Sequence, residues 1–330
     1  MPSKKVLSKS RVIVISDSQD AHLPFVEPHL DAPFIVIDPR EFASGKELTY
    51  RFEAGKTLVS YDGMNLHDIS GVWYRKPQPI TLDELSVKVG ADFEEYSKTA
   101  MQRHVNLMLT AFNDAVWVSD YFALIRANNK SLQIAVAQQL GMNVPETVMT
   151  SDKDVAEKFI KSHARSITKP LTISYPVVNG KHKVFFTTLL EKGFIPDLSQ
   201  LHLAPAIFQR AIGIVDDVRV IVVGDKVFAA TVHAEGVPTN TKVYDYRLGH
   251  YEGKVVLEAL HDFPEELARQ CVAHNKALGL RFGALDFVRD KDGIFWFLEN
   301  NPNGQWAFVE NATGQPIGKA MASLLQGDSQ

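Results

Sequence analysis

Two apolar segments on either side of Asp290-Lys291-Asp292-Gly293 constrain this chain more than any other feature. Residues 282–289 (FGALDFVR) and 294–300 (IFWFLEN) have the composition of strands, and Asp-Gly is a strong signal for a two-residue hairpin loop. With that loop, Asp286 lies directly opposite Glu299, because the loop length sets the register of a hairpin. The sequence therefore predicts a hairpin that places two carboxylates side by side.

These two carboxylates predict a site for a hard cation. Residues that lie directly opposite each other share a face, with Cβ atoms about 5 Å apart, and Asn301 follows Glu299 by two residues, which puts it on the same face. The opposite face is expected to carry the apolar Leu285, Phe287 and Leu298. Opposed like charges destabilise a sheet unless a proton or a cation lies between them, and oxygen ligands suit Mg²⁺. The alternative is a one-residue slip in register that separates the two acids and leaves both in solvent.

Three basic side chains in separate segments are candidates for binding anions. Lys169 ends a β pattern just before a loop, where a lysine can reach phosphate as a point charge. Lys130 opens a helix, whose exposed N-terminal amides also suit an anion. Arg219 lies in the middle of an apolar strand, where an arginine requires a partner. The alternatives are two ordinary solvated lysines and a salt bridge from Arg219 to Asp217, two residues away on the same face.

The order of helical and β patterns predicts an α/β chain with α+β parts, divided into three domains: residues 1–122, 123–205 and 206–330. The expected strands are 12–16, 33–38, 48–53, 57–62, 71–76, 116–119, 146–150, 165–170, 184–190, 206–212, 217–223 and 226–233, besides the two of the hairpin. The expected helices are one with an apolar face of Met101, Val105, Met108, Leu109 and Phe112, then 128–140, 151–163 with Ser151 as its N-cap, 264–278 and 314–325.

Composition excludes several classes of protein. The 330 residues are 45% hydrophobic, which is ample for a large core, and the formal charge of -4 gives no general footprint for nucleic acid or membrane. The single cysteine, Cys271, excludes an internal disulfide and a cysteine-rich zinc site. No apolar run approaches the roughly 20 residues of a membrane span, and the N-terminus has no signal-peptide pattern. We therefore expect a cytoplasmic globular protein.

The order of these motifs resembles that of the ATP-grasp superfamily. A helix lysine and a strand lysine are followed by IFQRAI (207–212), DVRVIVVGDKVFAATV (217–232), GALDF and FLENNPNGQW. More narrowly, VWYRKP (72–77), the stretch 128–152 and LENNPNGQW resemble the microviridin-type peptide maturases, also called graspetide synthetases, to which RimK-type ligases are more distantly related. The resemblance covers nearly the whole chain and is weakest at 171–205 and 234–262.

The resemblance implies an ATP-grasp fold behind an N-terminal pre-ATP-grasp domain, with ATP and Mg²⁺ as cofactors. It implies roles for residues already singled out and for the segment that precedes Arg219. Asp286, Glu299 and Asn301 would bind Mg²⁺, Lys130 and Lys169 the nucleotide and its phosphates, Gln209, Arg210, Ala211 and Ile212 the adenine, and Arg219 with Lys169 would stabilise the phosphate charge.

The implied reaction is an ATP-dependent ring closure in a ribosomal precursor peptide that carries a leader segment. An Asp or Glu side chain becomes an acyl phosphate, ADP is released, and a Lys, Ser or Thr of the same peptide closes a macrolactam or macrolactone. Tyr246 and Arg247, in a segment that matches no core pattern, would contact the peptide. A homodimer is also implied by the resemblance.

Two alternative functions follow from the same residues. A ligase similar to RimK or glutathione synthetase would act on free amino acids instead of a peptide. An ATP-binding protein without turnover is the other alternative, since Gln209-Arg210 replaces a frequent glutamate of the family and residues 171–183 contain only Gly180 in place of a glycine-rich loop.

Overall fold

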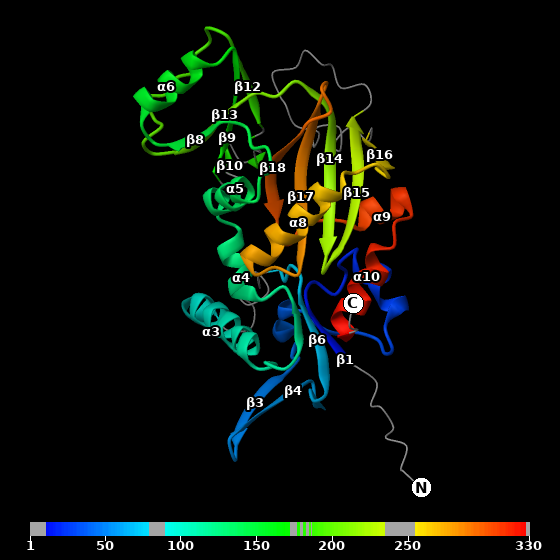
Figure 1. Cartoon of the computed structure of the whole chain (residues 1–330). Coiled ribbons are helices and arrows are strands. Elements are labelled where there is room, and N and C mark those ends of the chain that lie inside the picture. The colour runs from blue at the N-terminus through cyan, green and yellow to red at the C-terminus, as the bar shows by residue number, and fades with distance from the viewer. Residues whose placement is uncertain are drawn as a thin grey trace.

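The computed structural model describes residues 11–78, 90–171, 177–178, 181–182, 185, 187–234 and 255–327 of the chain, and three of its five sheets have four or five strands. In Figure 1 a parallel sheet lies at the bottom, a small antiparallel sheet at the upper left, and a larger antiparallel sheet at the upper right. The expected mixture of helices and strands is confirmed. The domain boundaries at 122 and 205 stay predictions.

The parallel sheet is built from the N-terminal residues. Its strands lie in the order β2 (Ile35–Ile37), β1 (Arg11–Ile15), β6 (Ile69–Tyr74) and β7 (Val116–Val118). A side sheet contains β3 (Leu48–Glu53), β4 (Lys56–Tyr61) and β5 (Met64–Asn65), and the helical segments are α1 (Leu23–Val26), η1 (Glu27–His29), η2 (Pro39–Ser44), η3 (Ala91–Phe93), α3 (Glu94–Asn106) and η4 (Leu107–Thr110). The expected long helix therefore ends at Asn106 and continues as a 3₁₀ turn, which keeps Met108 in the core.

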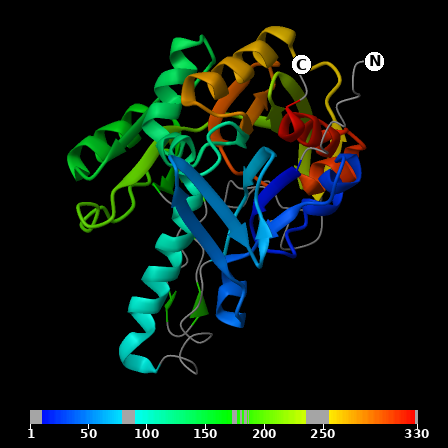
Figure 2. The same cartoon turned by 90° about the horizontal axis from the view of Figure 1, so that it is seen from below.

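Both faces of this parallel sheet are buried, as its continuous apolar strands require. Ile13 and Ile15 pack with Val105 of α3, whereas Val12 and Val14 pack with the C-terminal helix α10 (Ile317–Gln326). Figure 2 shows α3 and α10 on opposite sides of the sheet. The last helix of the chain thus completes the core of its first sheet.

The small antiparallel sheet belongs to the middle of the chain. Its strands lie in the order β12 (Thr188–Glu191), β9 (Arg165–Pro170), β13 (Ala206–Arg210) and β8 (Thr147–Thr150). The helices of this part are α4 (Tyr121–Ala127), α5 (Lys130–Gln139) and α6 (Lys153–Ser162), and β10 (Val177–Val178) pairs with β11 (Lys181–His182). The cap of α6 is Asp152 rather than the predicted Ser151, because the Asp152 carboxylate accepts the amides of Asp154 and Val155.

The larger antiparallel sheet holds the predicted hairpin. Its strands lie in the order β16 (Val255–Ala259), β15 (Lys226–Ala234), β14 (Ile214–Val223), β17 (Phe282–Asp290) and β18 (Phe295–Asn301). One face packs on α8 (Glu265–Leu278), which contributes Cys271 as a fully buried thiol, and α9 (Ala307–Thr313) follows the hairpin.

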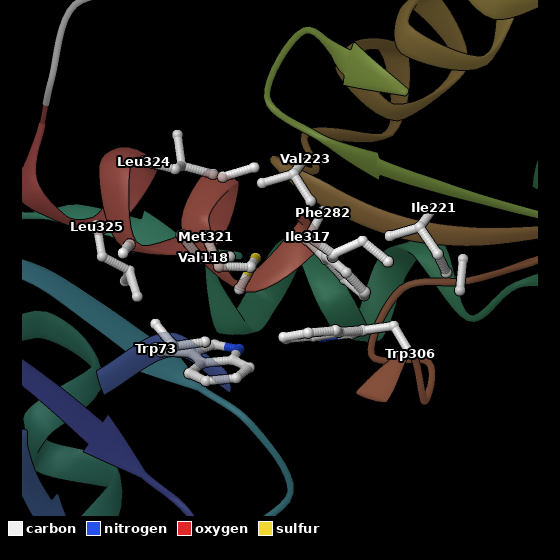
Figure 3. Close-up of a cluster of buried hydrophobic side chains, with 14 of the residues drawn as sticks. Trp73, Val118, Ile221, Val223, Phe282, Trp306, Ile317, Met321, Leu324 and Leu325 are labelled. Carbon is white, nitrogen blue, oxygen red and sulfur yellow. The ribbon is translucent and has the colours of Figure 1, made fainter. Parts of the chain in front are cut away.

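The C-terminal helix joins the parallel sheet to the larger antiparallel sheet. Figure 3 shows Trp73 of β6 and Trp306, just before α9, close to Met321 and Ile317 of α10. The backbone of β6 approaches the helix so closely that a Cβ on Gly71 would lie 2.2 Å from the carbonyl oxygen of Leu325. The two sheets are therefore held in a fixed relation by one shared core.

No helix in the described part of the chain is long and apolar enough to cross a membrane.

Candidate metal and nucleotide site

Four charged side chains form one row across three strands and a helix. Asp286 of β17 lies opposite both Arg219 of β14 and Glu299 of β18 in the sheet, so the three side chains share one face. The Arg219 Nε lies 3.2 Å from the Asp286 carboxylate, and Lys130, from the start of α5, forms an ion pair with Glu299. Each carboxylate thus has a cation beside it, and Asp286 is an ion-pair partner of the mid-strand arginine.

The hairpin reaches this register by a route that the sequence did not predict. Asp290 pairs with Ile294 around three residues, and Gly293 adopts φ 78°, so the loop is one residue longer than the expected Asp-Gly loop. A β-bulge at Leu298 then adds one residue to β18 and restores Asp286 to Glu299. The opposed acids are therefore confirmed, but the expected two-residue loop is wrong.

The bulge also changes the environment of Leu298. Leu285 and Phe287 lie in the core beneath α8, as expected, but Leu298 lines a pocket with Val288 on the other face. An inserted residue breaks the strict alternation of a strand, which is why the predicted core position of Leu298 is wrong.

That pocket lies between the small sheet and the larger antiparallel sheet. It brings together five of the six residues expected to contact the nucleotide, namely Lys169, Gln209, Arg210, Ala211 and Ile212, whereas Lys130 does not line it. The remaining lining residues are Ile167, Thr187, Ile214, Asp217, Val288 and Leu298. Apolar walls with a few convergent polar groups are typical of a small-molecule site.

The shape of the pocket is fixed by contacts from its own lining residues. Gln209 is buried and donates through Nε2 to the Thr147 hydroxyl at 2.8 Å. The Arg210 guanidinium lies over the Trp296 ring, 4.8 Å from its centroid. The end of β13 is therefore positioned by Thr147 through Gln209 and by Trp296 through Arg210.

The pocket and the charged row share one face of the sheet. Asp217 and Val288, which line the pocket, are opposite each other in the β14–β17 ladder. Arg219 and Asp286 form a pair two residues further along the same two strands. Because residues two apart on a strand face the same way and lie about 7 Å apart, a ligand in the pocket can extend over the charged row.

The donor set of the row fits a hard cation. Among the described residues no group of three His, Cys, Asp or Glu side chains could hold a metal ion. The candidate donors are the carboxylates of Asp286 and Glu299 and the carboxamide of Asn301. Asn301 lies on the same face as Glu299, and its Oδ1 accepts the Asn303 amide at 3.2 Å, which orients the carboxamide and leaves a second lone pair. Mg²⁺ is usually held by one or two carboxylates, with water and phosphate oxygens as further ligands.

A buried network attaches α5 to the strand that carries Glu299. The Gln133 carboxamide donates to the Asn300 carbonyl at 2.7 Å and accepts the Asn300 amide at 2.9 Å. His274 and Asn275 of α8 hold the Asn300 side chain from the other side. Lys130, on the first turn of α5, is therefore fixed relative to Glu299, although it does not line the pocket.

The N-terminal sheet also reaches the site, which the local sequence patterns did not predict. Arg75, buried at the end of β6, donates to the Asn303 carbonyl at 2.7 Å, and the Asn303 carboxamide donates to the Arg75 carbonyl. His22 Nε2 accepts the Trp306 amide at 3.0 Å, and His22 also pairs with Asp20. The NPNGQW segment after Asn300 is thus held by side chains from the first sheet.

The pKa values of Asp20, Arg75 and His22 are all shifted from their ordinary values. Burial opposes the ionisation of Asp20, but the hydrogen bond with His22 and the charge of Arg75 outweigh it and lower its pKa to about 2. Burial lowers the pKa of Arg75 to about 10, although Asp20 acts in the opposite direction. Burial also lowers the pKa of His22 below its ordinary value. At neutral pH the cluster therefore contains an ion pair and a neutral imidazole.

Two groups of predicted residues cannot be placed. Tyr246 and Arg247 lie outside the described residues, and so does most of the segment 171–183 that was expected to replace a glycine-rich loop.

Comparison with known proteins gives a family for most of the chain and solved structures of similar fold. The profile of the RimK-like ATP-grasp domain matches residues 127–325. A RiPP-associated ATP-grasp ligase of Chryseobacterium gregarium, solved with ADP and a leader and core peptide, has 22% identity and a TM-score of 0.88, and the alignment covers 97% of this chain and 98% of that one. The macrocyclase MdnC of Microcystis aeruginosa MRC, bound to its precursor peptide MdnA, has 23% identity and a TM-score of 0.78 over 96% and 100%. The ATP-grasp ligase PsnB, solved with a minimal precursor, Mg and ADP, has 21% identity and a TM-score of 0.72 over 96% and 98%. Comparison with curated proteins gave no match.

Proposed function

This chain belongs to the RimK-like ATP-grasp domain family, and we propose that it is an ATP-dependent ligase that forms rings in a ribosomal precursor peptide. The product would be a macrolactam or a macrolactone. The three solved ligases reported above, which it resembles along nearly their whole length, were each solved with a precursor or with leader and core peptides, which supports a peptide substrate over a free amino acid.

The observation that carries this proposal is the row of Lys130, Glu299, Asp286 and Arg219 beside the pocket that Lys169 lines. Phosphoryl transfer requires little covalent chemistry from a protein and depends on positioning and on neutralising charge. An apolar slot, a pair of carboxylates for a hard cation and basic side chains from β14, β9 and α5 provide both.

The first chemical step activates the acid. A carboxylate oxygen of the substrate forms a bond to the γ-phosphorus of ATP, and the bond from that phosphorus to the β,γ-bridging oxygen breaks, so ADP leaves with the electron pair. Asp286, Glu299 and Asn301 would hold Mg²⁺, which supplies charge neutralisation when bound. Lys169 would contact the phosphates from the pocket, and Arg219 would stabilise the transferring group from within the row.

The second step closes the ring. A Lys amine or a Ser or Thr hydroxyl of the peptide forms a bond to the acyl carbon, the carbon–oxygen bond to phosphate breaks, and the nucleophile loses one proton. The reaction requires no serine or cysteine nucleophile from the protein. The lactam or lactone outcome depends on the peptide.

The experiment first asks whether a short peptide with an acid-rich core is encoded beside the gene, and then combines that peptide with the purified protein, ATP and Mg²⁺. We expect ADP release together with a peptide mass lower by one water for each ring. A parallel reaction with free glutamate tests the RimK-like alternative, since ADP release with glutamate but not with peptide would favour it. Nucleotide binding without ADP release with either acid would favour a binding protein without turnover.

The homodimer and the cytoplasmic location stay predictions; analytical ultracentrifugation of the purified chain would decide the former.

A further inference from the structure

Lys76, in the sequence motif VWYRKP, has no role in the proposed function. It lies beside the charged row of Lys130, Glu299, Asp286 and Arg219, here named the metal row. It follows Arg75, whose carbonyl accepts a hydrogen bond from the Asn303 carboxamide. Asn303 in turn donates its backbone amide to Asn301 at 3.2 Å. The peptide bond between Arg75 and Lys76 is therefore hydrogen-bonded to the turn that follows β18.

The position of Lys76 in the parallel sheet also favours a ligand site. β6 ends at Tyr74, and Arg75 continues the ladder by donating its amide to Ile15, so Lys76 lies at the carboxyl edge of parallel strands. Ligands of α/β proteins bind at that edge of a parallel sheet. In this protein that edge lies next to the larger antiparallel sheet, because Arg75 contacts Asn303, which follows β18.

Lys76 is half-buried, and its charge is not neutralised by an ion pair with any residue in the ranges that the structure describes. Burial and the positive charge of Arg75 lower its pKa, Asp20 acts in the opposite direction, and Arg219 lowers it further. Asp20 is already engaged by His22 and by Arg75. A half-buried ammonium group beside two guanidinium groups provides a place for an additional anion.

The order of groups along the sheet indicates which anion this is. The pocket lies at the level of Asp217 and Val288, and the metal row lies two residues further, at Arg219 and Asp286. Asn301 lies one further step along β18, and Lys76 is attached beyond it through Asn303. Lys76 and the nucleotide pocket are thus on opposite sides of the metal row.

In phosphoryl transfer the attacking and leaving oxygens lie roughly in line, on opposite sides of the phosphorus. If the leaving ADP occupies the pocket and the γ-phosphoryl group lies over the metal row, the acceptor oxygen lies on the side of Lys76. We propose that Lys76, together with Arg219, binds the carboxylate of the side chain that is to be phosphorylated. This inference rests on the proposed function and adds a carboxylate-binding residue from the N-terminal sheet.

The binding experiment needs no turnover, so it can succeed even if the proposed ring closure fails. N-acetyl-L-glutamate is titrated into protein saturated with Mg²⁺ and ADP, and binding is followed by NMR chemical shifts, with N-acetyl-L-glutamine as the uncharged comparison. We expect Lys76→Met to weaken binding of the acid by about tenfold or more, the scale of one charge-assisted contact. Lys56→Met, at an exposed lysine of β4, is the matched control and should bind like the wild type.

The same variants distinguish the substrate acid from the γ-phosphate as the anion. Affinities for Mg²⁺-ADP and for a Mg²⁺-bound, non-hydrolysable ATP analogue are measured by calorimetry, and Lys76→Met should leave both unchanged. A loss confined to the ATP analogue would assign Lys76 to the γ-phosphate and overturn the proposal. Equal binding of N-acetyl-L-glutamate by Lys76→Met and wild type, or no preference of the wild type for the acid over the amide, would overturn it as well.

Discussion

The carboxamide of Gln133 forms two hydrogen bonds with the backbone of Asn300, one to its carbonyl and one from its amide. The pairing resembles a rung of a β-ladder, with a helix side chain in place of a neighbouring strand. Because Asn300 lies between Glu299 and Asn301, these bonds fix the position of two candidate metal ligands along β18 relative to α5.

Replacing Gln133 by leucine should therefore destabilise the fold and loosen the site. The variant leaves the buried Asn300 amide and carbonyl unpaired, and each such group costs about 1–3 kcal/mol. We expect a loss of at least about 2 kcal/mol in the free energy of unfolding, measured with urea. Gln138→Leu, on the exposed side of the same helix, controls for the substitution itself. Equal loss in both variants would contradict the role of the network.

Glu299→Gln should abolish ADP formation while the fold remains. The amide preserves size but removes the charge opposite Asp286, so the pair of carboxylates for Mg²⁺ is lost. ADP release is measured at saturating ATP and Mg²⁺, and circular dichroism verifies the fold. Asp292→Asn, in the exposed turn of the same hairpin, should retain activity. Unchanged turnover in Glu299→Gln would remove this residue from the site.

Lys169→Ala should weaken ATP binding by tenfold or more, or about 1.4 kcal/mol, which is the scale of one charge-assisted contact. Lys169 lines the pocket at the end of β9, where its ammonium group can reach a phosphate. The affinity is measured by calorimetry with Mg²⁺ and a non-hydrolysable ATP analogue. Lys192→Ala, an exposed lysine of the same part of the chain, is the control. Identical isotherms for Lys169→Ala and wild type would place the phosphates elsewhere.

Asp20 should make stability depend on pH in the acid range. Its pKa is about 2 in the folded protein and 3.8 as an ordinary aspartate, so its contribution is present above pH 3.8 and lost as the pH falls toward 2. Near pH 6 we expect Asp20→Asn to be less stable than wild type by up to about 2 kcal/mol. The difference in free energy of unfolding between wild type and Asp20→Asn, measured with urea, should become smaller below pH 4.

If the difference in free energy of unfolding between Asp20→Asn and wild type stays constant from pH 6 to pH 3, the lowered pKa of Asp20 is contradicted. Asp31→Asn, at an exposed aspartate near α1, controls for the loss of one negative charge.

Local patterns were sufficient for much of the fold and of the site. The strands around Lys169, Arg219 and the hairpin were predicted within a few residues, because alternation and turn chemistry are encoded over short stretches. Short α4 and α9 were missed, since seven residues give too little periodicity to identify a helix. Lys169 was chosen from its β pattern and Gln209 to Ile212 by family resemblance, and the structure brings these five residues to one pocket.

The sequence by itself determined that Asp286 and Glu299 belong to one hairpin, since both acids are within a few residues of one turn. Only the tertiary structure decided which partners these acids have. Three contacts join residues that are far apart in the chain. They are the ion pairs of Lys130 with Glu299 and of Arg219 with Asp286, and the hydrogen bond of Arg75 to Asn303. Local propensity carries no information about such contacts, because they form when separate elements bury their apolar faces against one another and bring their polar ends together.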